Sequence, residues 1–517
     1  VHVAKGVKCV DCHAAGSMAV DERIRGKEVH QFGKGDDPSG WVRNDLDNTV
    51  RTCNDCHLTG YLNAPVARHK WLPDLHLEKL SCQACHIPQR KVKSALVQVS
   101  DIFNPGTKIT PLPKYTWTFY DQNMNYWNHY GELTMFTAKD QPSDPFIPEY
   151  AKYKGQIFPV NAVHSAWPGI YTEGEKGLDQ PKQRDIYNMW IAHNKDKSKY
   201  PELGKIKDHN SDSIPEVNTA GEIDAFINSV TAYLSDQGYS LTGKKIVWVN
   251  NDKMYLNGND YKILEKEYWE SSPYASVYKY SHDVYPAKAG LGINGCTDCH
   301  SFNSDMFFRQ VVKYPFGEDG QPVMQPQYKK LGMSSTGLWL SAFREQIIKS
   351  IEYPALFLLL LIILLSIACS VNRKQEFISI HQGILLLVYG IIIAGLVLVY
   401  LKPDVRNYVL PDRLTLDANH FILTVIALLV GAYTWLRDKK ENQHGSVTGR
   451  LQALSIILAV ISGILMMIKF NLIYQVVRVA YTIFDLAVVT SLILSVIWFI
   501  NQQVNAVRNE IRTDQVN

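Results

Sequence analysis

Four short segments of the chain follow the pattern Cys-x-x-Cys-His. They are Cys9/Cys12/His13, Cys53/Cys56/His57, Cys82/Cys85/His86 and Cys296/Cys299/His300, here called the first to fourth motifs. Two thiols about one helical turn apart can each bond to one vinyl group of a porphyrin, and the histidine that follows can ligate the iron. Eight of the nine cysteines belong to these motifs. The sequence therefore predicts four covalently bound haem c groups.

Cysteine pairs with this spacing also occur in zinc sites, where two pairs close a tetrahedral site. A zinc site does not explain a histidine after every pair. Thioredoxin-like redox pairs fit less well, because no βαβ pattern surrounds the motifs. The remaining cysteine, Cys369, lies in an apolar run and is interpreted as a small buried residue of a membrane helix.

Each iron has room for a second axial ligand, and the sequence offers five free histidines for that role. They are His2, His30, His69, His76 and His282. The alternative for each is an ordinary surface histidine. His282 lies in a Pro- and Gly-containing stretch that runs to Ser301 and includes the fourth motif, so this stretch is a candidate to supply both axial ligands of one iron.

The 517 residues divide into two parts of different composition. We predict an extracytoplasmic tetrahaem domain at 1–345, with a haem-free insert at about 91–275, and a membrane bundle at 346–517. The expected fold class is mainly α with irregular loops. Three motifs within the first 90 residues leave little room for an ordinary apolar core, so the porphyrins would supply the buried apolar surface and short helices would form around each motif. The net charge of +3 is too balanced to indicate a nucleic-acid partner.

The insert is rich in aromatic residues, and we interpret it mainly as a wrap that covers the haems and offers a partner surface. Two regular segments stand out within it. Residues 220–236 have a helical pattern, and 242–255 alternate like a strand pair with a turn near Asn251. Nothing in the insert marks a substrate pocket.

Five apolar runs follow, and they predict a bundle of five transmembrane helices. The runs are 354–370, 377–401, 420–436, 451–468 and 476–500. Haem attachment is extracytoplasmic, so an odd number of spans puts the C-terminus in the cytoplasm and the protein in the inner membrane. No signal peptide precedes Cys9, so we expect either a removed signal or a longer precursor.

Ionisable residues within spans are costly and are functional candidates. His420 and Asp485 both lie toward the outer side, with Lys469 and Arg478 at the same boundary. This group suits the hydrogen bonding and proton exchange of a quinone headgroup. The alternative is polar contact between helices. We do not expect a haem b held by this chain alone, because His381 lies at the opposite face from His420; sharing one with another subunit remains open.

The tetrahaem part resembles the octahaem tetrathionate-reductase-like multihaem cytochromes c. The similarity covers about residues 1–310 and the second half of that family's haem set. It is carried, in order, by GVKCVDCHAAG, DLDNTVRTCNDCHLTG, LEKLSCQACHIP and GINGCTDCHS. The resemblance implies stacked haems with two histidine ligands each, and it favours His30, His69, His76 and His282 as distal ligands. The family's catalytic haem has a lysine ligand, and this chain has no C-x-x-C-K motif.

These patterns together favour a membrane-anchored electron carrier between the quinone pool and an extracytoplasmic partner, such as another multihaem cytochrome or redox subunit. One alternative is a haem enzyme that reduces or oxidises a small sulfur or nitrogen compound, which requires an iron with an open distal side. Another is an anchor subunit of a larger respiratory complex. We expect the haems to carry the redox chemistry while the protein sets ligands, packing and exposure.

Overall fold

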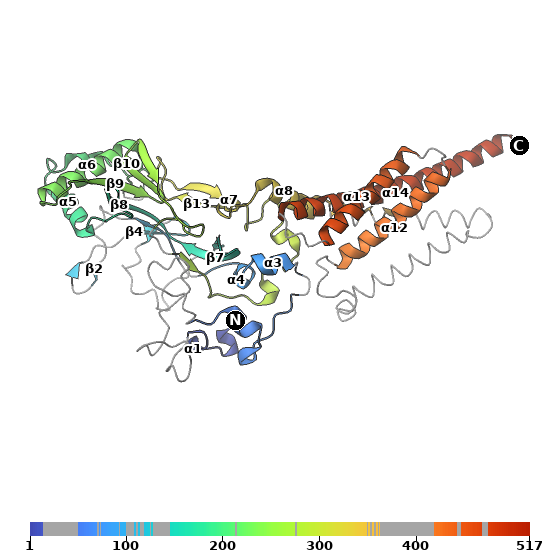
Figure 1. Ribbon diagram of the computed structural model, residues 1–517, viewed down its shortest axis with the longest axis horizontal. Helices are drawn as coiled ribbons and strands as arrows, with labels where there is room; N and C mark the ends of the chain where they lie inside the picture. Colours follow the sequence, from blue (N-terminus) through green and yellow to red (C-terminus); the bar gives the residue numbers. More distant parts are fainter. Residues whose placement is uncertain are drawn as a thin grey trace. The chain divides into compact units, whose positions relative to one another are not determined.

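The structure is a computed structural model, and it describes most of the chain outside three long segments (Figure 1). The described residues are 1–13, 50–69, 72, 74–91, 94–99, 108–109, 112–113, 118–124, 126–127, 145–211, 215–273, 277–348, 350–351, 354–355, 358–359, 361, 418–441, 446–467 and 474–516. Within these ranges, side-chain burial is not described for 418–424 or 474–478.

The chain forms two compact units. The first unit contains Val1–Ala67, Lys79–Ile293 and Asp305–Gly332, and the second contains Arg68–Glu78, Asn294–Ser304 and Met333–Asn517. The fourth motif and the segment around His76 thus fold together with the C-terminal helices. This division differs from the predicted boundary at residue 345, since two short segments from the N-terminal part belong to the second unit.

A short α-helix forms at each of the first three motifs. They are α1 (Cys9–Cys12), α2 (Cys53–His57) and α4 (Cys82–His86). In α2 the carboxylate of Asp55 accepts a hydrogen bond from the Thr52 amide at 2.6 Å, and in α1 Asp11 accepts from Lys8 at 2.7 Å. Such caps satisfy amides that have no partner within the helix. The aspartate before the second cysteine therefore helps to close the turn that brings the two thiols together.

The fourth motif differs from the other three in its backbone. Only the 3-10 turn η6 (Cys296–Asp298) forms there, and Cys299 lies just beyond its end, with φ −112° and ψ −37°. The Cys299 amide donates to the Cys296 carbonyl at 3.2 Å, a bond between residues three apart that is typical of a 3-10 turn. The His300 amide also donates to the Cys296 carbonyl, at 2.8 Å, so Cys296 and Cys299 still lie about one helical turn apart in this tighter turn.

The haem-free insert is built around a seven-stranded sheet. Its strand order is β11-β10-β9-β8-β1-β4-β5, and β1 and β8 are its parallel neighbours. The strands are β1 (Ala95–Val99), β4 (Thr118–Asp121), β5 (Tyr126–Trp127), β8 (His164–Thr172), β9 (Lys244–Asn250), β10 (Lys253–Asn257) and β11 (Asp260–Ile263). The β9–β10 hairpin turns at Asn251, whose φ is 58°, so the strand pair and turn expected at 242–255 are confirmed.

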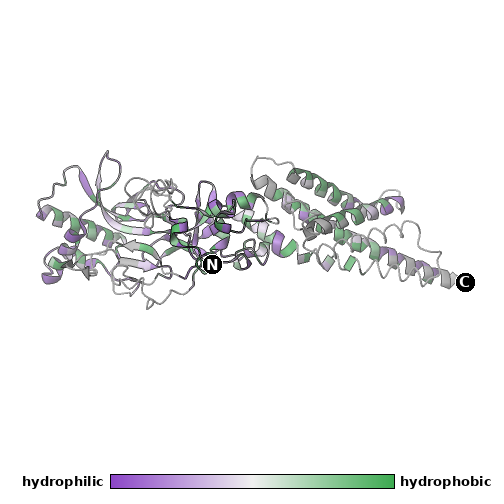
Figure 2. Ribbon diagram, turned by 90° about the horizontal axis from the view of Figure 1, so that it is seen from below, coloured by the Kyte–Doolittle hydropathy of each residue, from purple (hydrophilic) through white to green (hydrophobic). Residues whose placement is uncertain are grey.

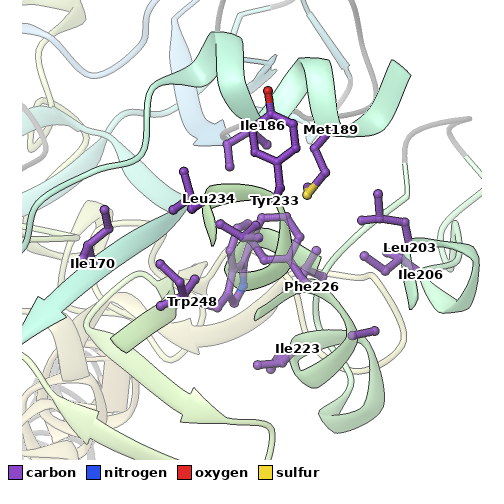
Figure 3. Close-up of a cluster of buried hydrophobic side chains, with 14 of the residues drawn as sticks. Ile170, Ile186, Met189, Leu203, Ile206, Ile223, Phe226, Tyr233, Leu234 and Trp248 are labelled. Atoms are coloured by element: carbon purple, nitrogen blue, oxygen red, sulfur yellow. The ribbon is translucent and has the colours of Figure 1, made fainter. Parts of the chain in front are cut away.

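Two helices of the insert, α5 (Gln183–Lys195) and α6 (Ala220–Asp236), enclose the largest buried apolar cluster. The helix predicted at 220–236 is confirmed. Figure 3 shows Phe226 and Tyr233 of α6 beside Trp248 of β9, and the Phe226 and Trp248 ring centres lie 5.1 Å apart. Both faces of β9 are covered, because Val247 and Val249 belong to a second cluster with Trp167.

Shorter elements complete the first unit. They are η1 (Val3–Lys5), η2 (Tyr61–Asn63), η4 (Pro201–Lys205), η5 (Ala287–Ala289), α7 (Gln327–Lys330), the three-stranded sheet of β6 (Glu149–Tyr153), β7 (Gln156–Ala162) and β12 (Val277–Lys279), and the hairpins β2 (Lys108–Ile109) with β3 (Leu112–Pro113) and β13 (Gln310–Tyr314) with β14 (Val323–Pro326). The expectation of a mainly α haem domain with irregular loops is therefore wrong. Strands occupy 18% of the chain, and they organise the segment that was interpreted as a wrap.

The second unit combines α3 (Asp74–Lys79), most of which belongs to it, with the C-terminal helices. These are α8 (Ser335–Phe343), the π-helical turn η7 (Arg344–Ile348), α12 (Ala418–Glu441), α13 (Val447–Met467) and α14 (Tyr474–Val516). Helices α12, α13 and α14 run beside one another, and in Figure 2 much of their ribbon has the colour of hydrophobic residues. Gln452 of α13 donates to Ser491 of α14 at 2.7 Å, a polar contact between apolar helices.

The predicted five-helix membrane bundle is not what the structure shows. Among the described residues, two helical segments are long and apolar enough to cross a membrane, Val447–Leu465 and Val479–Gln502. This supports association with a membrane. The run at 377–401 lies outside the described residues, as does most of 354–370. In α12, charged and polar residues at Arg437–Glu441 shorten the apolar length available for crossing.

Candidate haem-binding sites

The eight cysteines predicted to bond the porphyrins are all at least partly accessible. Cys9, Cys82 and Cys296 are exposed, and the other five, Cys12, Cys53, Cys56, Cys85 and Cys299, are half-buried. None is fully buried, so the surrounding protein does not seal any motif against a porphyrin. At the fourth motif the exposed Cys296 and the half-buried Cys299 are joined by the 3-10 turn described above. Covalent attachment at these cysteines stays a prediction.

Three motif histidines each lie beside one of the free histidines named above. The ring centres of His2 and His57 are 6.1 Å apart, those of His13 and His282 are 6.3 Å apart, and those of His76 and His300 are 5.9 Å apart. The planes of the last two pairs are tilted by 21° and 19°. The pairs are drawn from segments far apart in the sequence.

This spacing can be compared with what one metal ion between two imidazoles requires. A metal–imidazole bond is about 2 Å long, and the nitrogen lies about 1 Å from the ring centre, so two such rings have centres about 6 Å apart. All three pairs match this separation. The cysteines of each motif lie directly before its histidine, and the residues present therefore fit haem c groups with two histidine ligands.

Two of the motif histidines have their Nδ1 atoms engaged elsewhere. His57 Nδ1 lies 2.9 Å from the Pro65 carbonyl oxygen, and His300 Nδ1 lies 2.8 Å from the Ser341 hydroxyl. A ligating histidine commonly donates its other ring N–H to such a partner, which fixes the tautomer and the ring orientation. In both rings, Nε2 is the nitrogen left to face the opposite histidine.

His282 is positioned by Arg90, a residue that the sequence did not single out. The Arg90 guanidinium is buried, donates to the His282 carbonyl at 3.3 Å and lies 3.4 Å from the Asp283 carboxylate. It also lies 4.1 Å from the centre of the Tyr280 ring. The ring beside His282 is that of His13, so the stretch up to Ser301 does not bring His282 beside His300.

The stretch that follows His282 instead wraps the third motif. The Tyr285 amide donates to the His86 carbonyl at 2.8 Å, and the Leu291 amide donates to the Cys85 carbonyl at 2.9 Å. A Cβ added at Gly290 would meet the Cys85 carbonyl oxygen at 3.4 Å, so a small residue suits this close approach. The segment between His282 and the fourth motif thus packs on the third motif, and His282 itself lies beside His13 of the first.

The three distal candidates are in surroundings that favour neutral imidazole, the form that binds metals. Burial lowers the pKa of His282 below its ordinary value, and the neighbouring His13 and Arg90 lower it further. Burial and then Arg344 lower the pKa of His76. Burial and then His57 lower the pKa of His2.

The first three motifs lie close to one another. The Cys53 thiol of the second motif is hydrogen-bonded to Cys82 of the third, which raises the pKa of Cys53 and lowers that of Cys82. Burial and then Cys56 raise the pKa of Cys12. Arg51 joins the first two motifs, because its amide donates to the Cys12 carbonyl at 2.9 Å.

The remaining motif histidine, His86 of the third motif, belongs to none of these three pairs. Two distal candidates from the sequence also remain. His30 lies outside the described residues, and His69 lies on an exposed stretch that belongs to the second unit. Among the described residues, the distal candidates His2, His76 and His282 each lie beside a motif histidine.

In the second unit, the His76–His300 pair is connected to the C-terminal helices. Ser341 of α8 contacts His300, and Arg344 of η7 reaches Asp485 of α14 with Nε 3.4 Å from the carboxylate. The Arg344 guanidinium also pairs with Glu345 and lies 5.3 Å from the centre of the Tyr481 ring. The sequence does not predict these contacts.

The group predicted as a quinone site is only partly described. Asp485 is 1% exposed and is ion-paired with Arg344. His420 lies on α12 with its side chain outside the described residues, as is the side chain of Arg478, while Lys469 and His381 lie outside them altogether. The structure thus assigns Asp485 a partner that the sequence did not suggest.

Comparisons with known proteins identify no relative, since no family model, curated protein or solved structure matches the chain.

Proposed function

We propose that this chain is a membrane-associated multihaem cytochrome c that transfers electrons between the quinone pool and an extracytoplasmic redox partner. The observation that carries the proposal is the set of three histidine pairs, with ring centres 5.9–6.3 Å apart, each containing the histidine of a Cys-x-x-Cys-His motif. Four haem c groups bound at the four motifs would supply the redox chemistry. Two histidine ligands favour electron transfer over substrate binding at the iron.

The arrangement of the motifs supports transfer between successive centres. An electrostatic interaction between Cys12 and Cys56, and a hydrogen bond between Cys53 and Cys82, bring the attachment points of the first three motifs into one neighbourhood. The third and fourth motifs are joined through the chain by the 282–293 stretch, which wraps the third motif before the fourth begins. We keep His30 as a candidate to pair with His86, and His69 as a distal candidate without an assigned motif.

The fourth motif is the proposed point of exchange with the membrane. It shares one unit with α13 and α14, and Ser341, Arg344 and Asp485 connect the two. Trp339 and Phe302 beside it are exposed aromatics, with ring centres 6.0 Å apart. Tryptophan is enriched at membrane interfaces, so Trp339 suits this position. A quinone bound near Asp485 would then lie next to the His76–His300 pair.

The chemistry of haem attachment also suggests an orientation. Covalent attachment is extracytoplasmic, so we place the haem motifs on the periplasmic side of the inner membrane. Arg437, Lys439, Lys440 and Arg450 lie at the α12–α13 end, and Arg508 and Arg512 lie late in α14. The enrichment of basic residues on the cytoplasmic side puts these ends and the C-terminus in the cytoplasm.

The proposal is tested on the purified full chain in detergent. We expect four covalently bound haems by pyridine haemochrome stoichiometry, low-spin spectra, and rapid reduction by a naphthoquinol under anaerobic conditions. Haem that extracts into acid–acetone, or zinc in place of haem, would contradict the haem assignment. A high-spin fraction that binds small ligands would favour the enzyme alternative, and haem reducible by dithionite but not by quinol would favour an anchor subunit.

A further inference from the structure

A cavity of about 340 Å³ lies in the first unit, at the start of strand β8. We call it the His164 cavity. Its wall is formed by His164, by Asn251 and Asp252 of the β9–β10 turn, by the 266–271 segment, and by residues of β13, β14 and α7. The motif histidines and cysteines are not among its lining residues. The cavity is therefore a feature of the haem-free insert and its neighbours.

His164 contributes a polar group that the described residues leave unsatisfied. Its side chain is 2% exposed, and neither ring nitrogen has a hydrogen-bond partner of normal geometry among them. Asn251 is close enough to raise the pKa of the ring, but its one oxygen can serve only one of the two nitrogens. A buried polar group without a partner costs about 1–3 kcal/mol, so a ligand that supplies one would be stabilised.

Positive charge surrounds the ring. Burial lowers the pKa of His164 well below its ordinary value, and Lys330 and Lys266 lower it further. Lys330 is itself buried, lies 3.0 Å from Glu149 and donates to the Ser271 hydroxyl at 3.3 Å. The ring is therefore neutral, and the two ammonium groups disfavour a cation at this end of the cavity.

The other charges are nearly balanced, because Lys330 pairs with Glu149 and Lys266 with Asp252, which leaves Lys313 and Lys329 beside Glu267 and Glu270. Lysines in the wall outnumber carboxylates by four to three. Asp252 is already paired with Lys266 at 3.1 Å, and Glu270 accepts from the Glu267 amide at 2.8 Å. Lys313 and Lys329 complete the four, and Lys329 is exposed at the rim.

We propose that the His164 cavity binds a small oxyanion. The imidazole N–H of His164 would donate to one oxygen, and lysine ammonium groups would contact the others, as charge-assisted hydrogen bonds favour. The cavity volume is sufficient for such an ion together with water. This site is independent of the proposed quinone exchange, which lies in the other unit.

The cavity wall is connected to the third motif through strand β6. Glu149 pairs with Lys330, and the next residue, Tyr150, donates its hydroxyl to the Ala84 carbonyl at 3.5 Å. Ala84 lies between the two cysteines of that motif. Two adjacent residues of β6, Glu149 and Tyr150, therefore link an anion bound beside Lys330 to helix α4 of the third motif.

The test is isothermal titration of the full haem-loaded chain in detergent at low ionic strength. Sodium sulfate is the first probe because it is not reduced under these conditions, and sulfite and nitrite are separate arms. We expect one saturable site per chain. Lys329→Gln should weaken binding at least fivefold, because it removes a rim charge without disturbing a buried contact. His164→Gln should weaken it further.

Lys288→Gln is the matched control, since it removes an exposed lysine of the same unit that does not line the cavity. Its affinity should equal that of the wild type. The proposal is overturned if sulfate, sulfite and nitrite all fail to bind at about millimolar concentrations. It is also overturned if Lys329→Gln and Lys288→Gln change the affinity equally, since binding would then reflect net charge alone.

Discussion

At the scale of single residues, the main result is which histidines face one another. His282 faces His13 and His76 faces His300, although each lies closer in sequence to a different motif. Arg90 holds the first of these arrangements through the carbonyl and carboxylate that flank the imidazole. Which histidines lie beside one another therefore depends on tertiary contacts and not on proximity along the chain.

This pairing predicts a selective effect of methionine substitution. His282→Met should raise the reduction potential of the haem at the first motif by on the order of 100 mV, a fraction of the range that axial ligands span. His76→Met should do the same for the haem at the fourth motif. Redox titration with spectroscopic resolution of the four centres measures both.

Each variant is the experimental control for the other, because each leaves the other histidine pair intact. If both substitutions shift the same centre, the pairing described here is incorrect. Unchanged potentials and spectra in both would mean that neither histidine is a ligand.

Much of this chemistry could be predicted from residue types. The spacing of Cys, Cys and His predicts the attachment points, and His2, His76 and His282 are among the five distal candidates, although the resemblance favours His30 and His69 over His2. The assignment of each histidine to a motif could not be predicted, because it depends on Arg90 and on the packing of 282–293 against the third motif. Those contacts join residues nearly 200 positions apart.

At the scale of elements, the sheet of the insert shows why its fold was missed. Strand β8 is buried at seven consecutive positions, so it lacks the alternation that marks a half-buried strand. It also carries Pro168 and Gly169 in its interior, where proline normally argues against a central strand. Helix α6 was predictable because Thr219 and Glu222 form a capping box before an amphipathic segment.

Helix α8 supplies the hydroxyl that orients His300, and this predicts the effect of Ser341→Ala. Loss of the acceptor for the Nδ1 proton should make the imidazole a weaker donor to the iron, which favours the reduced state. The potential of the haem at the fourth motif should rise by about 30–60 mV, up to a tenfold change in a one-electron equilibrium.

Redox titration of the full chain checks this value. Ser350→Ala is the control, because Ser350 lies just beyond η7, is exposed, and bonds only to the nearby Ile347 carbonyl. Equal potentials in Ser341→Ala and the wild type would show that the contact does not influence the ligand.

At the scale of the whole molecule, the chain consists of two units with different contents. The first holds the first three motifs, two of the three histidine pairs and the sheet, and the second holds the remaining pair and the helices suited to a membrane. A break in composition near residue 345 predicted two parts but could not reveal that 68–78 and 294–304 join the second. The composition of 68–78 and 294–304 does not show that these segments fold with the C-terminal helices.

The ion pair between Arg344 and Asp485 connects helix α14 to the segment that contacts the fourth motif, and it predicts the effect of removing the Asp485 charge. Asp485 is buried on α14, so Asp485→Asn removes a charge from a site where Arg344 and Glu345 remain. Arg344 keeps Glu345 as a partner in this variant, so we expect a cost below the roughly 3–5 kcal/mol of a buried charge left without any partner. Because Arg344 is also close enough to influence His76, the change should disturb the region where a quinone would meet the fourth motif.

We expect Asp485→Asn to slow quinol-driven haem reduction by about tenfold or more, as loss of either a proton acceptor or the local geometry would. Stopped-flow mixing with a naphthoquinol measures this, while haem content and reduction by dithionite should be unchanged. Asp485→Glu restores a carboxylate and should recover most of the rate, and Thr490→Val, an exposed site on the same helix, should have no effect. His420→Ala should weaken quinone binding as well. A normal quinol rate in both Asp485→Asn and His420→Ala would mean that the Arg344–Asp485 pair serves only to pack the helices, and that quinol reacts at another place.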